Sequence, residues 1–173
     1  EDAPGVGLAA PQVHVPLRLF VFRIPGERAS PDAEDTRVPN SVLINPTMEL
    51  MGEERALGWE GCLSIPGLRA AVPRATRVRY RGVDCDGRPV EREVTGFHAR
   101  VVQHEYDHLD GVLYTMRLTD FGLFGFNEEL GRAAEAAQRE AASANAGSAA
   151  SAGAAPGAGT SGRAGPTGAE AAR

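Results

Sequence analysis

The segment 101–111, VVQHEYDHLDG, contains the residues of this sequence with the clearest chemical potential. Within it, His104, Glu105 and His108 form the pattern His-Glu-x-x-His. Residues four apart lie one helical turn above each other, so the two imidazoles could bind the same metal ion. Glu105 would then lie near the open coordination position, where a water molecule can be activated. The pattern therefore predicts a hydrolytic metal site that still lacks one protein ligand.

Three positions could supply the missing ligand. An extended metalloprotease motif requires histidine three residues after Gly111, and the sequence has Tyr114 there, which excludes that class. Glu128 has the separation of metalloproteases that take a glutamate from the following helix, although it also fits an ordinary charged helix face. Cys62, in the segment EGCLS, offers a thiolate that binds Zn or Fe well, although free cysteines are often only small buried side chains. Spacing alone leaves Glu128 and Cys62 open.

A third segment, residues 5–12, has the sequence GVGLAAPQ. Its Gly-x-Gly pattern does not predict a phosphate-binding loop, because no strand precedes it and Pro11 blocks the required helix entry. Taken in order, GVGLAAPQ, EGCLS and QHEYDHLDG resemble the three signature motifs of the peptide deformylases, with no substitution at a functional position. The resemblance extends from Gly5 to about Leu118.

The resemblance implies an α+β fold of mostly antiparallel strands packed around a central helix that carries the His-Glu-x-x-His motif. It implies one divalent metal ion, Fe(II) in the first place and Zn(II) as the alternative, with three ligands: Cys62, His104 and His108. Glu105 would be the general acid and base, and Gln12 and the backbone N–H of Leu63 would stabilise the developing oxyanion. The substrate's methionine side chain and the peptide beyond it would contact five residues: Val6, Gly7, Arg69, Phe97 and Val101.

The implied reaction removes the formyl group from the N-terminal formylmethionine of newly made proteins. A metal-activated hydroxide would attack the formamide and give formate and a free amino terminus. The implied partners are N-formylmethionyl nascent peptides, with weak ribosome association and a location in the bacterial cytoplasm. Two alternatives remain open from the residues themselves: an endopeptidase that uses Glu128 as its third ligand, and a catalytically disabled metal-binding fragment.

Strands and helices that position the three motifs are also predicted by the sequence. Apolar runs and alternating patterns bounded by turn residues indicate strands at Leu17–Ile24, Val42–Asn45, Met48–Met51, Thr76–Val83 and Pro89–Thr95. The second and third are expected on either side of an Asn45-Pro46 turn, and the last two as a hairpin. Gly96 then breaks the strand pattern, and a helix is expected until Asp110-Gly111, followed by a second helix over 125–141. Strands followed by helices favour an α+β fold over alternating β-α-β units.

Composition divides the chain of 173 residues into two parts. Residues 1–140 are expected to form the metal-dependent deformylase domain, without the segment that precedes the first motif in the family. Residues 141–173 consist almost entirely of Ala, Gly, Ser, Thr and Pro, so we expect a disordered tail. The net charge of −5 gives no electrostatic reason to expect nucleic acid or an anionic membrane as partner. Cys62 and Cys85 do not suggest a disulfide scaffold.

Overall fold

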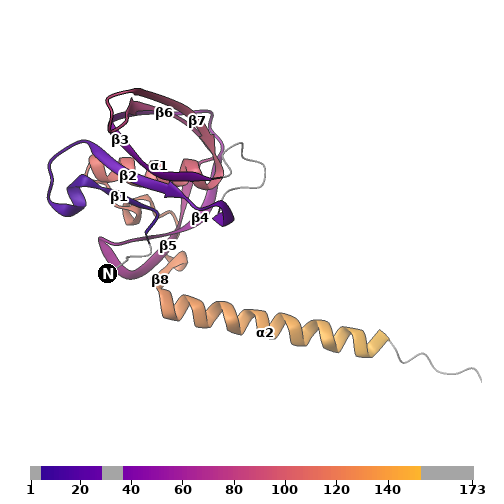
Figure 1. Ribbon diagram of the computed structural model, residues 1–173. Helices are drawn as coiled ribbons and strands as arrows, with labels where there is room; N and C mark the ends of the chain where they lie inside the picture. Colours follow the sequence, from indigo (N-terminus) through magenta and orange to yellow (C-terminus); the bar gives the residue numbers. More distant parts are fainter. Residues whose placement is uncertain (1–4, 29–36, 153–173) are drawn as a thin grey trace, which may run out of the picture. The chain divides into compact units, whose positions relative to one another are not determined.

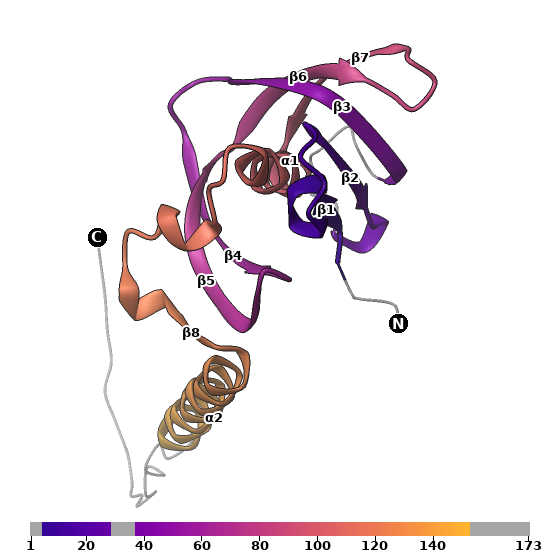
Figure 2. The ribbon, with the colours of Figure 1, turned by 90° about the vertical axis from the view of Figure 1, so that its left-hand side faces the viewer.

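The computed structural model describes residues 5–28 and 37–152, with side chains described as far as residue 142. The chain forms two units, Glu1–Gly131 and Arg132–Arg173, and the predicted site residues all belong to the first. In that unit, two antiparallel sheets surround helix α1 (Gly96–Leu109), as Figures 1 and 2 show. The predicted α+β class, with mostly antiparallel strands around a central helix, is confirmed.

The larger sheet has five strands in the order β1-β2-β3-β6-β7. Their bounds are β1 Gly7–Ala9, β2 Leu19–Ile24, β3 Val38–Leu50, β6 Arg77–Val83 and β7 Pro89–Thr95. Side chains alternate across β2, so that Phe20, Phe22 and Ile24 are buried against α1 while their neighbours face outward. The predicted hairpin is confirmed as β6 and β7, and the first motif forms β1, a short strand at the edge of this sheet.

The smaller sheet has three strands in the order β4-β5-β8: β4 Arg55–Cys62, β5 Ile65–Ala75 and β8 Phe124–Phe126. The sequence patterns did not predict β4 and β5, although this long hairpin carries the second motif at its turn. The register of the pair shifts between Gly61 and Cys62. Such irregularities redirect side chains and are common beside active sites.

Helix α1 begins and ends where the sequence predicted. Gly96, at φ 57°, and Gly111, at φ 71°, both adopt the left-handed backbone region that favours glycine, so the chain can turn into and out of the helix. One buried side chain locks α1 against β5: Gln103 donates to the carbonyl of Ala75 at 2.9 Å and accepts from its N–H at 3.0 Å. Ala99 and Val102 pack in the core, so both sheets hold the histidine-bearing helix rigidly.

The Asn45-Pro46 pair does not form the predicted turn between two short strands. Strand β3 continues from Val38 to Leu50, pairing with β2 on one side and β6 on the other. Asn45 has φ 48°, and the β3–β6 register shifts between Ile44 and Thr47. The local turn signal therefore produces a bulge within one strand, because β2 pairs with β3 up to Ile44 and β6 pairs with it from Ile44 onward.

Helix α2 (Asn127–Ala152) extends further than the expected end at residue 141. Residues 141–152, expected as the start of a disordered tail, are helical, since alanine has the highest intrinsic helix propensity. The rest of that predicted tail, 153–173, lies outside the described residues.

Neither described α-helix combines the length and the apolar character that a membrane crossing requires. Cys62 and Cys85 are both free thiols.

Candidate active site

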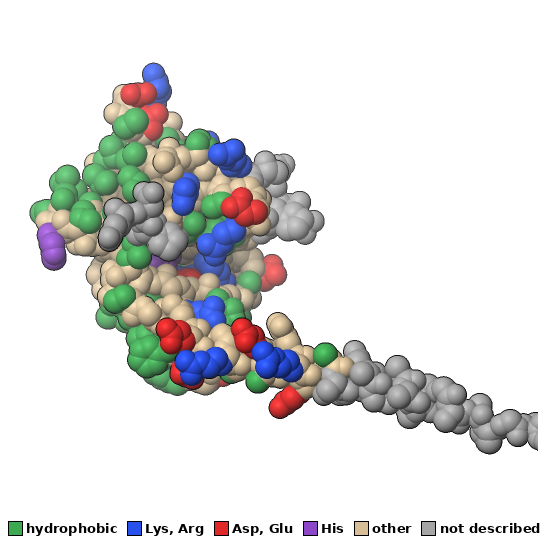
Figure 3. Space-filling model, turned by 60° about the horizontal axis from the view of Figure 1, so that its bottom comes forward, with side chains coloured by type: hydrophobic (Ala, Val, Ile, Leu, Met, Phe, Trp, Pro, Cys, Tyr) green, Lys and Arg blue, Asp and Glu red, His purple; other side chains and the backbone are tan. Residues whose placement is uncertain are grey.

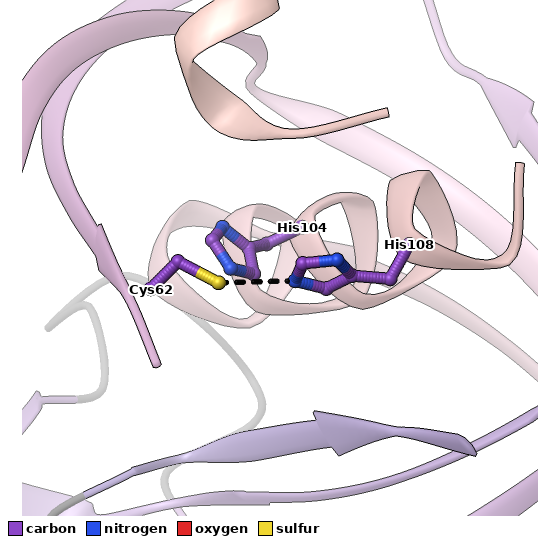
Figure 4. A group of neighbouring side chains, drawn as sticks. All are labelled: Cys62, His104 and His108. Atoms are coloured by element: carbon purple, nitrogen blue, oxygen red, sulfur yellow. Dashed lines mark hydrogen bonds between the residues drawn. The ribbon is translucent and has the colours of Figure 1, made fainter. Parts of the chain in front are cut away.

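Three potential metal ligands meet where the β4–β5 turn lies against α1. His104 and His108 project from successive turns of α1 with ring centroids 5.0 Å apart, and the Sγ atom of Cys62 lies 3.2 Å from Nε2 of His108 (Figure 4). The ligand atoms of the three residues all lie within 4.8 Å of one another. Among the described residues this is the group that could hold a metal ion, and Glu128 is not part of it.

The donor set of one thiolate and two imidazoles fits a divalent transition metal. It suits Zn(II) and Fe(II), and three protein ligands leave a fourth position open for water or substrate, as in catalytic metal sites. Although burial raises the pKa of the Cys62 thiol, hydrogen bonds with His104, His108 and Ser64 lower it to about 5. The thiol is therefore ready to bind as a thiolate.

Glu60 contacts His104 on the ring nitrogen that does not face the other ligands. Its Oε2 atom lies 2.8 Å from Nδ1 of His104, which fixes the imidazole tautomer and leaves Nε2 for the metal position. Arg74 donates to both carboxylate oxygens of Glu60 at 2.9 Å and is also paired with Asp107. Burial raises the pKa of Glu60, but the hydrogen bonds from His104 and Arg74 outweigh it and hold the pKa near 2. Glu60 is thus ionised at neutral pH, beside the ligand His104.

Glu105 lies beside the ligands with its carboxylate almost completely buried, at 4% exposure. Burial raises its pKa to about 7, against an electrostatic lowering from the neighbouring His104 and His108. Its Oε2 atom has no hydrogen-bond partner among the described residues. A Cβ atom on Gly7 would lie 2.2 Å from Oε1 of Glu105, so the glycine of β1 makes room for this carboxylate. An unpaired buried oxygen facing the cleft is well placed to receive a proton.

Gln12 holds its side-chain amide in one orientation. Its Oε1 atom accepts from the backbone N–H of Ala9 at 2.8 Å, so the NH₂ group must point the other way. That group donates to Oγ of Ser64 at 3.0 Å and toward Sγ of Cys62 at 3.6 Å. A donor is therefore fixed beside the ligand group at the cleft.

An open cleft of about 450 Å³ leads to this group. Figure 3 shows a hollow on this face, with basic side chains around it. The predicted site residues that line the cleft are Val6, Gly7, Gln12, Cys62, Leu63, Phe97, Val101, His104 and Glu105. Arg69 does not line the cleft. Its guanidinium lies 5.5 Å from the ring centre of Trp59, and Trp59 does line the cleft.

Comparison with known proteins agrees with this geometry. Residues 1–122 match the family described as polypeptide deformylase. Peptide deformylase 1 of Nitrosomonas europaea is 54% identical over 126 residues, which are 73% of this chain and 70% of that protein.

The chain belongs to the peptide deformylase family.

As a member of that family it is a metal-dependent hydrolase. Peptide deformylase 2 of Ralstonia nicotianae is 55% identical over 130 residues, covering 75% of this chain and 72% of the relative. Two solved structures share the fold. A class I type b peptide deformylase from Acinetobacter baumannii has a TM-score of 0.59 and 42% identity, covering 66% of this chain and 71% of its own. The peptide deformylase from Synechococcus elongatus in complex with actinonin has a TM-score of 0.58 and 39% identity, over 67% of this chain and 57% of its own.

Two charged residues that support the metal ligands were not predicted from the sequence. Glu60 is the residue beside His104, and it stands within the second motif, directly before Gly61 and Cys62. Arg100 lines the cleft and lies four residues before His104, on the same face of the helix. Only Arg100 carried a sequence signal, its helical spacing from His104. Glu60 lies on strand β4 and meets His104 only through the fold.

Proposed function

We propose that this chain hydrolyses the formamide of N-formylmethionine at the start of newly made peptides, giving formate and a free amino terminus. The observation that carries the proposal is the group Cys62, His104 and His108 with the buried, unpaired carboxylate of Glu105 beside it at the end of an open cleft. A metal ion held by the three ligands would supply the Lewis acid that makes water nucleophilic near neutral pH. We place Fe(II) first, on the family resemblance, and Zn(II) second, since the donor set suits both.

Proton transfer is assigned to Glu105. Its carboxylate accepts the proton of the attacking water and returns it to the amine that leaves, as general acid–base catalysis requires. The low exposure of this carboxylate keeps bulk water from competing for the proton. The room provided by Gly7 keeps the carboxylate at the cleft.

Charge on the formyl oxygen is assigned to two donors, the side-chain amide of Gln12 and the backbone N–H of Leu63. Both residues line the cleft, and the Gln12 amide is held in place by Ala9. Donors fixed in advance need no reorganisation when the charge develops, which makes this contribution large.

The methionine side chain is assigned to the apolar part of the cleft. Val6, Phe97 and Val101 line it, and Gly7 on the edge strand β1 lets the peptide backbone approach closely. We assign Arg69, whose guanidinium lies 5.5 Å from the ring centre of Trp59, to the peptide beyond the methionine. The partners we propose are formylmethionyl nascent peptides, and the location we propose is the bacterial cytoplasm. Ribosome association through α2 would be weak, since its described part mixes acidic and basic side chains: Glu128, Glu129, Arg132, Glu135 and Arg139.

The proposal is tested with anaerobically prepared chain of measured metal content. It is incubated with formyl-Met-Ala-Ser, acetyl-Met-Ala-Ser and a longer blocked peptide. Formate is expected from the first peptide, no acetate from the second, and no internal cleavage of the third. Internal cleavage without formate would favour the endopeptidase alternative instead. If folded, metal-loaded chain produces neither formate nor internal cleavage, the second alternative, a catalytically disabled metal-binding fragment, would be favoured.

Replacing Gln12 by glutamate is expected to lower kcat by about 10²–10³-fold, because losing one oxyanion donor typically costs that much. Glutamate can still accept from the N–H of Ala9, so the local fold should remain. The measurement is kcat for formate release at equal metal content. Ser64→Ala is the matched control, since it removes the hydroxyl partner of Gln12 but leaves the amide, and kcat should change by only a few-fold. Equal losses in the two variants would contradict the oxyanion role.

A further inference from the structure

Arg100 is a charged residue in the cleft to which the proposed reaction gives no role. It lies on α1, one turn before His104, and its side chain is only 13% exposed. The guanidinium reaches across to the smaller sheet, where NH2 donates to the carbonyl of Ala56 at 2.7 Å. NH1 donates to the carbonyls of Gly58 at 3.2 Å and Val72 at 3.0 Å. This side chain therefore binds α1 to both β4 and β5.

A fourth contact connects Arg100 to the metal ligands. NH1 of Arg100 also lies 2.8 Å from Oε1 of Glu60, while Oε2 of the same carboxylate lies 2.8 Å from Nδ1 of His104. Two residues four apart on one helix thus hold the two oxygens of a single carboxylate on β4. Arg74 approaches that carboxylate from β5 and also pairs with Asp107 of α1, so it links Glu60 to the helix through a second carboxylate. Arg100 is the cation on α1 itself that contacts Glu60 directly.

The sequence of β4 is adapted to this contact. Gly58 and Glu60 are two apart on the strand and so face the same side. A Cβ atom on Gly58 would lie 2.7 Å from Cζ and NH2 of Arg100. Only glycine at this position therefore allows the guanidinium to stay where it is. Cys62 follows two residues after Glu60 on the same strand. Because only Gly61 separates Glu60 from Cys62, whatever holds Glu60 against α1 also limits how far Cys62 can move from the two histidines.

We propose that Arg100 is a positioning residue for the metal centre: with His104 it clamps Glu60, and the clamp keeps Cys62 of β4 and the histidines of α1 at ligand separation. The inference rests on the proposed metal site. It assigns Arg100 no contact with substrate or with the reacting atoms. A plain structural tether between α1 and the smaller sheet is the rival explanation, and the two differ in what happens to metal affinity.

The test measures the dissociation constant of Co(II) and of Zn(II) for the full chain, by competition with a chromophoric chelator. Arg100→Met keeps the aliphatic stem in the cleft but removes the donors. Because residues that support metal ligands typically contribute 10–100-fold in affinity, we expect the dissociation constant to rise by about 10-fold or more. The Co(II)–thiolate absorption band should shift or weaken as well. Arg100→Lys, which retains a donor for Glu60, should recover part of the affinity.

Arg18→Met is the matched control. Arg18 also ties α1, donating to the carbonyl of Leu109 at 3.2 Å and to Oδ1 of Asp110 at 2.7 Å, but it lies at the other end of the helix from Arg100. Its replacement should leave the metal dissociation constant within two-fold. Unchanged metal affinity in folded Arg100→Met, with or without a lower melting temperature, would overturn the clamp and leave only the tether.

A double-mutant cycle tests whether Arg100 acts through Glu60. In a Glu60→Gln background, adding Arg100→Met should change the metal dissociation constant by less than about three-fold. A full additional loss in that background would overturn the proposal. If Arg100→Met does not fold, Gly58→Ala provides the test with the arginine intact, because it crowds the guanidinium, and the affinity loss should have the same direction.

The result is separable from the proposed function because metal binding is measured without substrate. Normal metal binding by the unmodified chain without formate release would defeat the proposed reaction and leave the clamp standing. Normal formate release by the unmodified chain, together with unchanged metal affinity in Arg100→Met, would defeat the clamp alone.

Discussion

Glu105→Gln is expected to lower kcat for formate release by about 10²–10⁴-fold, the usual contribution of a positioned general acid or base. Glutamine has nearly the same shape but cannot accept and return a proton. Metal content should stay at the level of the unmodified chain, since Glu105 is outside the ligand group formed by Cys62, His104 and His108. A variant with one equivalent of metal and kcat within ten-fold of the unmodified chain would contradict the assignment.

Gly7→Ala offers a second approach to the same carboxylate. The added Cβ atom would lie 2.2 Å from Oε1 of Glu105, so the carboxylate must move while its chemistry is retained. We expect a loss of kcat in the same direction, at unchanged metal content. Gly5→Ala is the matched control on the same segment, because its Cβ atom would meet only ordinary contacts at 3.5 Å and beyond.

Cys62→Ala is expected to abolish formate release and to weaken metal binding by more than the ~100-fold that a residue supporting a ligand can contribute. The thiolate is the one ligand from β4, and its removal leaves two imidazoles on one helix. Metal content by atomic emission and formate release, measured on the same preparation, check this expectation.

Two controls accompany the Cys62 variant. Glu128→Ala should keep both metal and activity, since Glu128 does not belong to the ligand group, and Cys85→Ala should do the same because Cys85 is an exposed free thiol. Loss of metal in Glu128→Ala with retention in Cys62→Ala would restore the endopeptidase alternative.

Helix α1 could be predicted because its signals are local. The periodicity of its apolar residues and the glycines at 96 and 111 lie within the segment they define. The Asn45-Pro46 pair is an equally local signal, but its outcome depends on β2 and β6. These strands pair with the first and second halves of β3, and the predicted turn becomes a bulge between the two halves. Tertiary pairing decides such cases, and a local pattern does not contain it.

The site divides in the same way. Spacing within α1 predicted that His104 and His108 can bind the same metal ion. It could not choose Cys62 over Glu128 as the third ligand, because that choice depends on how β4 packs against the helix. The resemblance to the family made the choice, and the geometry brings Cys62 to the histidines. The supporting charges were missed because Glu60 meets His104 across 44 residues of sequence and Arg100 across 40. Contacts at such separations are set by the fold and leave no periodic pattern.

Metal dependence tests the central claim most directly. The chain is stripped of metal with a chelator and then titrated anaerobically with Fe(II), and formate release from formyl-Met-Ala-Ser is measured at each addition. We predict no formate from the metal-free chain, a linear rise with added metal and a plateau at one equivalent. Full activity without metal, or no formate from folded chain that has bound one equivalent, would contradict the account.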